Sequence, residues 1–202
     1  DGNAAGLDII VTDHHSVGSE IPDALAVINP KLDDCGYNED MLAGVGVAYR
    51  LAEALYRVAA GNNRNGTPPN ADDLLDLVAI GTVADLVPLN RLENRMLVKR
   101  GLALVNRAQR PGLRALIDVS GLKQGGIGSE QIGYGIAPRI NAAGRLESAM
   151  IAFDLLSTDD WTQAALLANQ LHGLNTQRQE LTRAAQELVR EQIDDTSSIP
   201  LI

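Results

Sequence analysis

Two short apolar segments near the start of the chain have the pattern of strands. Residues 7–12 (LDIIVT) and 24–28 (ALAVI) are rich in branched apolar side chains and are bounded by turn-forming residues. Continuous apolar runs of this length are typical of buried strands in a parallel sheet. The turn-forming dipeptide Asn29-Pro30 ends the second segment,. We therefore expect a parallel sheet in this part of the chain.

Most of the remaining chain repeats its apolar residues at helical spacing. Asn70 is placed to cap one helix, with two aspartates in its first turn,. Asn90 and Glu93 have the spacing of a capping box for another helix, and Ser129 can cap a third. Helices are predicted over residues 41–60, 70–78, 91–106 and 158–195, with short helices after Pro111-Gly112 and after Ser129, and a loop over residues 62–69. The combined pattern predicts an α/β fold.

The last predicted helix is unusually long. From residue 158 to residue 195 its leucines recur every seven residues, with a companion row beside them. They are Leu167, Leu174, Leu181 and Leu188, with Leu171 and Ala185 in the companion row. At about 1.5 Å per residue the helix would be about 57 Å long, more than a compact domain of this size needs. We interpret it as a connector between two domains, with residues 1–157 as the first and 196–202 as the start of the second. Because the chain also begins without Met, directly before a strand, we expect it to be a segment of a longer protein.

Composition limits the class of protein. A chain that is 45% apolar and 21% charged is typical of a soluble globular protein,. Its one cysteine, Cys35, excludes an intramolecular disulfide and a cysteine-rich zinc site, so a reducing, cytoplasmic location is expected,. The apolar runs are too short to cross a membrane.

Charge is distributed unevenly along the chain. The net charge of −9 argues against a nucleic-acid partner, but residues 86–145 hold ten basic and only three acidic residues. Arg91, Arg95 and Lys99 share one stripe of a predicted helix. A basic segment between acidic flanks suits an anion-binding surface. A solvated helix face gives the same pattern.

Two groups of residues have the chemistry of a metal site. Asp13-His14-His15 follows the first predicted strand, and ligands of parallel sheets collect at the carboxyl ends of strands,. Adjacent histidines on an extended chain point in different directions, so one would ligate and the other would face elsewhere; a surface role is the alternative. Asp85 lies in the apolar run 81–89, where a carboxylate is costly unless it is paired or metal-bound; a helix-terminal aspartate is the alternative. His172 lies mid-helix and is expected to be a packing or solvent residue.

A third group suits phosphate. In residues 137–145 (APRINAAGR), Arg139 and Arg145 flank small residues and Asn141, which we interpret as a turn,. Small residues allow close approach of a ligand, and guanidinium groups bind phosphate oxygens in pairs. A tight turn with solvated arginines is the alternative.

Five segments, in this order, together resemble a known family. They are residues 11–15 (VTDHH), 29–30 (NP), 42–48 (LAGVGVA), 82–89 (TVADLVPL) and 138–146 (PRINAAGRL). The chain resembles the RecJ family of single-stranded-DNA-specific 5′→3′ exonucleases, within the DHH phosphoesterase superfamily. The last segment separates this resemblance from the oligoribonuclease, cyclic-dinucleotide phosphodiesterase and pyrophosphatase branches.

The resemblance implies a fold and a set of roles. The fold would be the C-terminal part of a parallel-sheet DHH phosphoesterase domain, followed by a long connector helix. Two Mn²⁺ or Mg²⁺ ions would be bound, with His14 and Asp85 as ligands. His15 would face the scissile phosphate, and Asp13 would ligate or orient the neighbouring imidazole. Arg139, Asn141 and Arg145 would lie near the phosphates of the DNA.

The resemblance also implies parts that the chain does not contain. The remaining metal aspartates would precede residue 1, and a DHH-associated domain would follow the connector helix. We therefore expect the 202-residue chain alone to be inactive. The whole protein would act on single-stranded DNA in repair and recombination, with a helicase and a single-strand-binding protein as candidate partners.

Two other functions remain open at this point. A DHH phosphodiesterase acting on short oligonucleotides or cyclic dinucleotides is one, and a non-catalytic DNA-binding scaffold of the same fold is the other. Only 3% of the residues are aromatic. Base stacking, the usual means of binding single strands, would therefore come from other domains, or the substrate would be held by its backbone.

Overall fold

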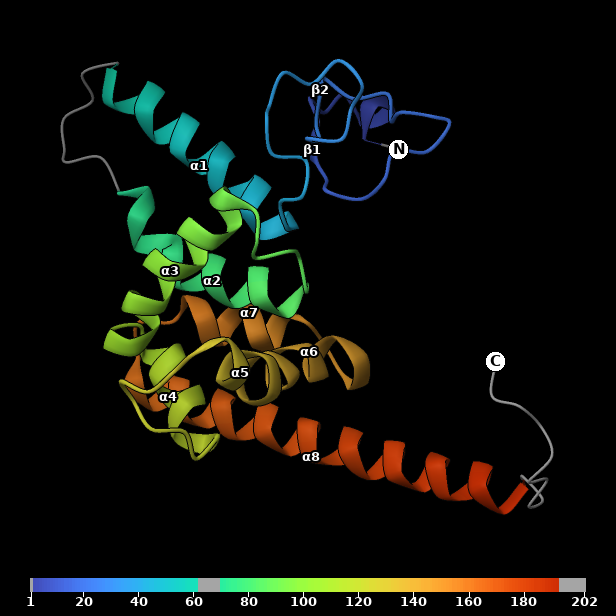
Figure 1. The fold of residues 1–202 in the computed structure, drawn as a ribbon, viewed down its shortest axis with the longest axis vertical. Coiled ribbons are helices and arrows are strands. Elements are labelled where there is room, and N and C mark those ends of the chain that lie inside the picture. The colour runs from blue at the N-terminus through green and yellow to red at the C-terminus, as the bar shows by residue number, and fades with distance from the viewer. Residues whose placement is uncertain (1, 62–69, 193–202) are drawn as a thin grey trace. The chain divides into compact units, whose positions relative to one another are not determined.

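The computed structural model describes residues 2–61 and 70–192 (Figure 1). The predicted loop at 62–69 and the expected domain start at 196–202 lie outside the described residues. Two compact units are present, each with its own packing. The first comprises residues 1–109 and 123–137, and the second comprises residues 110–122 and 138–202.

The first unit contains a small parallel sheet. After a 3-10 turn, η1 (Asn3–Ala5), strand β1 (Ile10–Thr12) pairs with strand β2 (Ala26–Ile28). Both predicted strands and their parallel pairing are confirmed, although each strand is shorter than expected. Their predicted burial is wrong, because Ile10 is 53% exposed and its neighbours Leu7 and Leu25 are exposed as well. In the described part of the chain the sheet has only these two strands, too few to enclose the side chains on both faces.

Helices form most of the first unit. They are α1 (Gly44–Gly61), η2 (Ala71–Leu74), α2 (Leu75–Ala84), α3 (Leu92–Arg107), α5 (Ser129–Gln131) and the π-helical turn η3 (Ile132–Ile136). Helix α2 is mostly apolar, with Asp76 and Thr82 as its buried polar residues, and it packs between α1 and α3 as the central element of the unit (Figure 1). The Asn70 side chain accepts a hydrogen bond from the Asp72 N–H (3.1 Å), which confirms the predicted cap.

Two other predicted caps are wrong. Helix α3 begins after Arg91 without a side-chain cap. Its Glu93 carboxylate instead accepts hydrogen bonds from Arg50 Nε (2.7 Å) and the Tyr37 hydroxyl (2.5 Å). A guanidinium is a stronger partner for a carboxylate than a backbone N–H, and this contact replaces the capping box. At α5 the cap residue is Gly128 rather than Ser129, and its N–H donates to Gln131 Oε1 (3.0 Å).

The second unit is helical. It comprises α4 (Pro111–Val119), α6 (Ala137–Leu146, except its first residue), α7 (Met150–Ser157) and α8 (Trp161–Gln192). Proline begins α4 because its fixed φ angle suits the first helical position,. The turn predicted around Arg139–Arg145 is wrong, since these residues form α6. Its alanines and arginines have high helix propensity, and the helix tolerates Asn141 and Gly144.

The long helix expected at the end of the chain is present over the described residues as α8. Its buried row consists of Ala164, Ala168, Leu171 and Asn175. The predicted leucine row is only partly used, because Leu181 and Leu188 are exposed. Ala164 and Ala168 let α8 approach α4 and α7 closely, and Leu171 of the predicted companion row is buried with them,.

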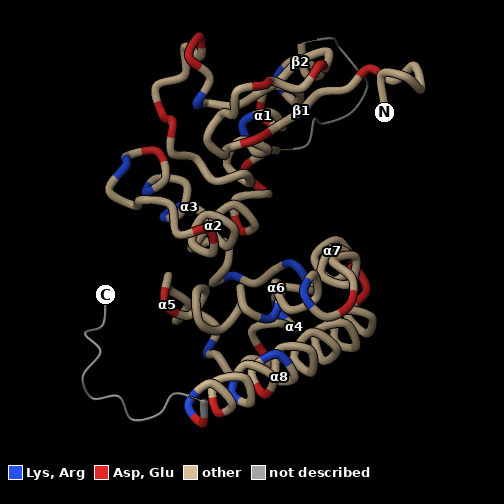
Figure 2. The backbone as a smooth tube through the Cα atoms, turned by 90° about the vertical axis from the view of Figure 1, so that its right-hand side faces the viewer, with Lys and Arg blue, Asp and Glu red and all other residues tan. Residues whose placement is uncertain are grey.

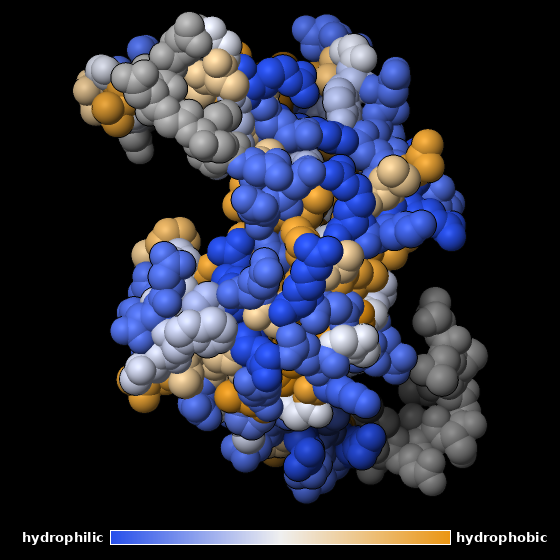
Figure 3. All heavy atoms as spheres, turned by 90° about the vertical axis from the view of Figure 1, so that its left-hand side faces the viewer, coloured by the Kyte–Doolittle hydropathy of each residue, from blue (hydrophilic) through white to orange (hydrophobic). Residues whose placement is uncertain are grey.

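Two basic residues, Arg91 of the predicted stripe and Arg100 beside it, are paired with aspartates. Arg91 lies before the helix rather than within it, and its Nη2 is 3.4 Å from the Asp40 carboxylate. Arg100 pairs with Asp72 at 2.6 Å. Figure 2 shows Lys and Arg interspersed with Asp and Glu along the backbone, and the face seen in Figure 3 is mostly hydrophilic. Among the described residues, every helix is too short or too polar to cross a membrane.

Gly101 provides a test of the α2–α3 packing. A Cβ at this position would lie 2.1 Å from the Leu75 carbonyl oxygen and 2.6 Å from Ala79 Cβ. We expect Gly101→Ala to lower the free energy of unfolding by about 1–3 kcal/mol, measured by chemical denaturation. Gly173→Ala is the control, because nothing lies within 4 Å of the added Cβ. Equal stability of the two variants would contradict close packing at Gly101.

Candidate functional site

The Asp13 carboxylate bends the loop that follows β1. Asp13 Oδ1 accepts hydrogen bonds from the backbone N–H groups of His14 (2.8 Å) and His15 (3.2 Å), and His15 Nδ1 lies 2.7 Å from the same oxygen. The chain therefore does not continue extended, and the two imidazole centroids are only 4.2 Å apart. The expectation that the rings diverge is wrong in this respect. The rings nevertheless have different partners, since His15 contacts Asp13.

His14 lies beside Asp85. His14 Nδ1 is 3.5 Å from Asp85 Oδ2, and the imidazole is the more buried of the two side chains. Two donors that bind one divalent cation at about 2.1 Å each are about 3.0–3.4 Å apart. The observed 3.5 Å is about 0.1 Å beyond this range, so a small approach of the two side chains would let both bind one ion. A nitrogen donor with an oxygen donor is a combination that Mn²⁺ accepts. No third His, Cys, Asp or Glu joins them within the residues that the structure describes. Their role as metal ligands remains a prediction.

A glycine makes room for the His14 ring. Gly44 begins α1, and a Cβ there would lie 3.0 Å from His14 Cδ2. A Cβ at Gly81 of α2 would lie 2.7 Å from the Val45 side chain. The start of α1 therefore approaches both His14 and α2 closely, which fixes the imidazole next to the end of α2. Sequence reasoning did not single out Gly44, although the small residues around the start of a predicted helix were a signal for close packing.

Asn29 fixes the histidine loop from the neighbouring strand. Its Nδ2 donates to the His15 carbonyl oxygen (3.0 Å), and its Oδ1 accepts from the Lys31 N–H (3.0 Å). The side chain is only 5% exposed. Sequence reasoning interpreted Asn29 as the end of a strand and as part of the family resemblance, without assigning a role to its side chain. An amide at the carboxyl end of a parallel strand, next to a candidate site, was the available signal.

The backbone beside Asp85 is strained. Asp85 caps the C-terminus of α2, and Leu86 follows with a φ angle of +58°. Glycine is the usual residue in this left-handed position, because a side chain is sterically disfavoured there. The Leu86 side chain is 88% exposed, so burial of this side chain does not offset the strain energy. Strain of this kind concentrates at functional sites, and here it adjoins the candidate metal carboxylate.

The three candidate phosphate contacts belong to the second unit. Asn141 and Arg145 are exposed on α6, and Arg139 is partly buried. Arg139 Nε donates a hydrogen bond to His172 Nδ1 of α8 (3.2 Å). Burial lowers the pKa of the Arg139 guanidinium. His172 is partly buried, which agrees with the expected packing role. Its hydrogen bond with Arg139 was not expected, because the two residues meet only once α6 and α8 are packed together.

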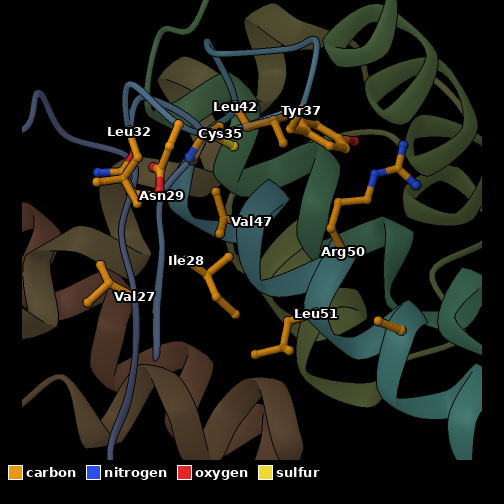
Figure 4. Close-up of a pocket in the computed structure, with 13 residues that line it drawn as sticks. Val27, Ile28, Asn29, Leu32, Cys35, Tyr37, Leu42, Val47, Arg50 and Leu51 are labelled. Atoms are coloured by element: carbon orange, nitrogen blue, oxygen red, sulfur yellow. The ribbon is translucent and has the colours of Figure 1, made fainter. Parts of the chain in front are cut away.

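An apolar cavity of about 450 Å³ lies in the first unit, apart from the histidine loop. Figure 4 shows Ile28 of β2 beside Val47 and Leu51 of α1 in its lining. Tyr37 lies at one side, where burial and its hydrogen bond to Glu93 raise its pKa to about 12. The lining also includes Asn29, Asp34, Cys35 and Arg50. Arg50 is paired with Glu93 and Asn29 is bound to the histidine loop, so both already have partners within the protein.

The Asp13–His15 contact makes a pH-dependent prediction. The hydrogen bond from the His15 side chain, assisted by the two backbone N–H groups, lowers the pKa of Asp13 from 3.8 to about 2. Ionised Asp13 therefore stabilises the folded state fully above pH 3.8, and this contribution is lost as the pH falls toward 2,. We expect His15→Ala to raise the Asp13 titration midpoint, measured by carboxyl-carbon NMR on metal-free protein. A wild-type midpoint near 3.8 would contradict the contact.

Known proteins are similar to this chain in sequence and in fold. Residues 2–82 match the family described as DHH family, N-terminal domain. The single-stranded-DNA-specific exonuclease RecJ of Bacillus subtilis (strain 168) is 44% identical over 96% of this chain and 24% of its own length. The protein of the same name from Salmonella typhimurium is 42% identical over 90% of this chain and 32% of its own length. The chain thus spans about a quarter to a third of these curated relatives.

Solved structures of RecJ are similar to this chain as well. The crystal structure of RecJ in complex with Mn²⁺ from Thermus thermophilus matches with a TM-score of 0.80 and 38% identity, over 95% of this chain and 28% of that one. A crystal structure of exonuclease RecJ bound to manganese matches with a TM-score of 0.80 and 39% identity, over 94% of this chain and 46% of that one. The mostly helical fold with a small parallel sheet is thus the fold of a RecJ segment. Over nearly its whole length, the chain is similar in sequence and in fold to a segment of RecJ proteins.

Proposed function

We propose that this chain forms part of a metal-dependent exonuclease that hydrolyses single-stranded DNA from the 5′ end. The observation that carries the proposal is the 3.5 Å separation of His14 Nδ1 and Asp85 Oδ2. It is supported by relatives that are named as single-stranded-DNA-specific exonucleases and by related structures titled as Mn²⁺ and Mg²⁺ complexes.

The residues around the loop after β1 would have different catalytic roles. His14 and Asp85 would hold one of two Mn²⁺ or Mg²⁺ ions, with further ligands supplied from outside this chain. When bound, such ions would lower the pKa of a water molecule and neutralise charge on the phosphoryl oxygens. Asp13 orients the His15 ring through their 2.7 Å contact. His15 is 77% exposed and so is accessible to the scissile phosphate.

Residues of α6 would bind the DNA backbone. Arg139 and Arg145 provide guanidinium donors that pair with phosphate oxygens, and Asn141 adds an amide. Binding mainly through the backbone gives little sequence preference and a steep dependence on salt.

Residues 1–157 would then be the C-terminal part of a DHH phosphoesterase domain, and residues 158–195 a connector helix. The exposure of every described side chain of α8 after Arg178 supports the connector role. Residues 196–202 would begin the following domain. A helicase and a single-strand-binding protein are the proposed protein partners.

The proposed activity is tested with the full-length protein. We expect Mn²⁺-dependent release of nucleotides from 5′-phosphorylated single strands. His14→Ala and Asp85→Asn should each lower kcat by about 100-fold or more, since even the loss of a residue supporting a metal ligand costs about 10- to 100-fold. Asp23→Asn, an exposed carboxyl in the same unit, is the control. The 202-residue chain alone should show no turnover.

Other outcomes identify other functions. Full turnover in both site variants would overturn the ligand assignment. Cleavage of dinucleotides or cyclic dinucleotides but not of long strands would indicate a DHH phosphodiesterase. Binding of single strands without any turnover would indicate a non-catalytic scaffold.

Arg139 is tested by its effect on salt dependence. If its guanidinium contacts a phosphate, Arg139→Ala should weaken binding of single-stranded DNA and reduce the slope of log K against log salt by about 0.7–1. Fluorescence anisotropy of a labelled oligonucleotide at several salt concentrations measures both. Arg114→Ala on α4, whose Nε is 3.2 Å from the Asp118 carboxylate, is the control. An unchanged slope would assign Arg139 a structural role.

A further inference from the structure

His172 is partly buried at the edge of the packed face of α8. It follows Leu171, which is completely buried, and it precedes Asn175, which is only 3% exposed. Arg178 Nε and Nη2 both donate to Asn175 Oδ1 (3.2 and 3.1 Å). The buried row fixes this part of α8, so the imidazole has a defined position next to α6.

The hydrogen bond from Arg139 of α6 determines the tautomer of the neutral His172 ring. Arg139 Nε always carries a proton and donates it to His172 Nδ1 at 3.2 Å,. Nδ1 must therefore be unprotonated, and in the neutral ring the proton is on Nε2. Partial burial of the guanidinium, which lowers the pKa of Arg139, agrees with a side chain held against the protein instead of extended into water.

An ordered arginine binds phosphate better than a mobile one. A free arginine side chain samples many rotamers, and ordering them at the moment of binding weakens the affinity. A hydrogen bond at Nε restricts these rotamers in advance and sets the plane of the guanidinium group. Lysine does not offer this arrangement, because its charge is a single point on a flexible stem.

We propose that His172 is a positioning residue that sets the Arg139 guanidinium for contact with a phosphate of single-stranded DNA. This inference rests on the proposed function, since it requires Arg139 to bind the DNA backbone. It assigns to α8 a direct effect on the candidate DNA contacts of α6.

Two substitutions at His172 separate positioning from packing. His172→Asn keeps an acceptor, because Asn Oδ1 occupies nearly the place of His Nδ1. His172→Leu fills similar space without an acceptor. In the full-length protein, with EDTA to prevent turnover, anisotropy with a labelled single strand should show about 3- to 10-fold weaker binding for His172→Leu. His172→Asn should bind within about 2-fold of wild type, and in turnover assays His172→Leu should raise KM without lowering kcat.

The double variant distinguishes this inference from the proposed function. If His172 acts through Arg139, His172→Leu should cause no further loss in an Arg139→Ala background. Equal losses for the Asn and Leu variants, or additive losses in the double variant, would overturn the positioning role. No effect of Arg139→Ala itself would instead overturn the proposed DNA contact.

NMR tests the contact even if His172→Leu fails to fold. In the wild-type protein the Arg139 Nε–H signal should be protected from exchange with solvent and should show scalar coupling to His172 Nδ1. His172→Asn should retain the protection. A rapidly exchanging Arg139 Nε–H in the wild-type protein would overturn the inference.

Discussion

The candidate metal centre depends on the approach of one imidazole to one carboxylate. His14 leaves the end of β1, and Asp85 leaves the end of α2. The two meet because α1 begins with Gly44, which leaves room for the His14 ring, and because Gly81 lets α2 approach the same turn of α1. Larger residues at Gly44 and Gly81 would push these elements apart and separate His14 from Asp85. The packing of β1, α1 and α2 thus brings together His14 and Asp85, which are 71 positions apart in the sequence.

Much of the local structure was predictable from periodicity and turn chemistry. Both strands, their parallel pairing, the Asn70 cap and the long final helix follow from patterns that act over a few residues. The errors have two causes. Glu93 has the spacing of a capping residue, but Arg50 from α1 binds it. Residues 137–146 contain turn-forming residues, but they continue as a helix. In each case a tertiary contact or a summed propensity outweighed the local signal.

The site was predictable in its residue types and less so in its supports. A carboxylate in an apolar segment and an Asp-His-His sequence after a strand both indicate metal chemistry, and the structure places His14 and Asp85 side by side. Gly44, Asn29 and His172 were missed as supports, because each acts through a contact between elements distant in sequence. Periodicity reports which face of a helix is buried. It carries no information about which polar atom on a neighbouring helix a side chain will meet.

The left-handed backbone at Leu86 sets stability against precision. Replacing leucine with glycine would relieve the strain at this helix terminus,. Glycine would also admit backbone conformations that leucine forbids, and the adjacent Asp85 carboxylate would share that freedom. The usual stabilising substitution, glycine at a helix end, would therefore increase the mobility of the backbone that places the Asp85 carboxylate beside His14. Thermostability is better sought in the outer half of α8, where the side chains are exposed.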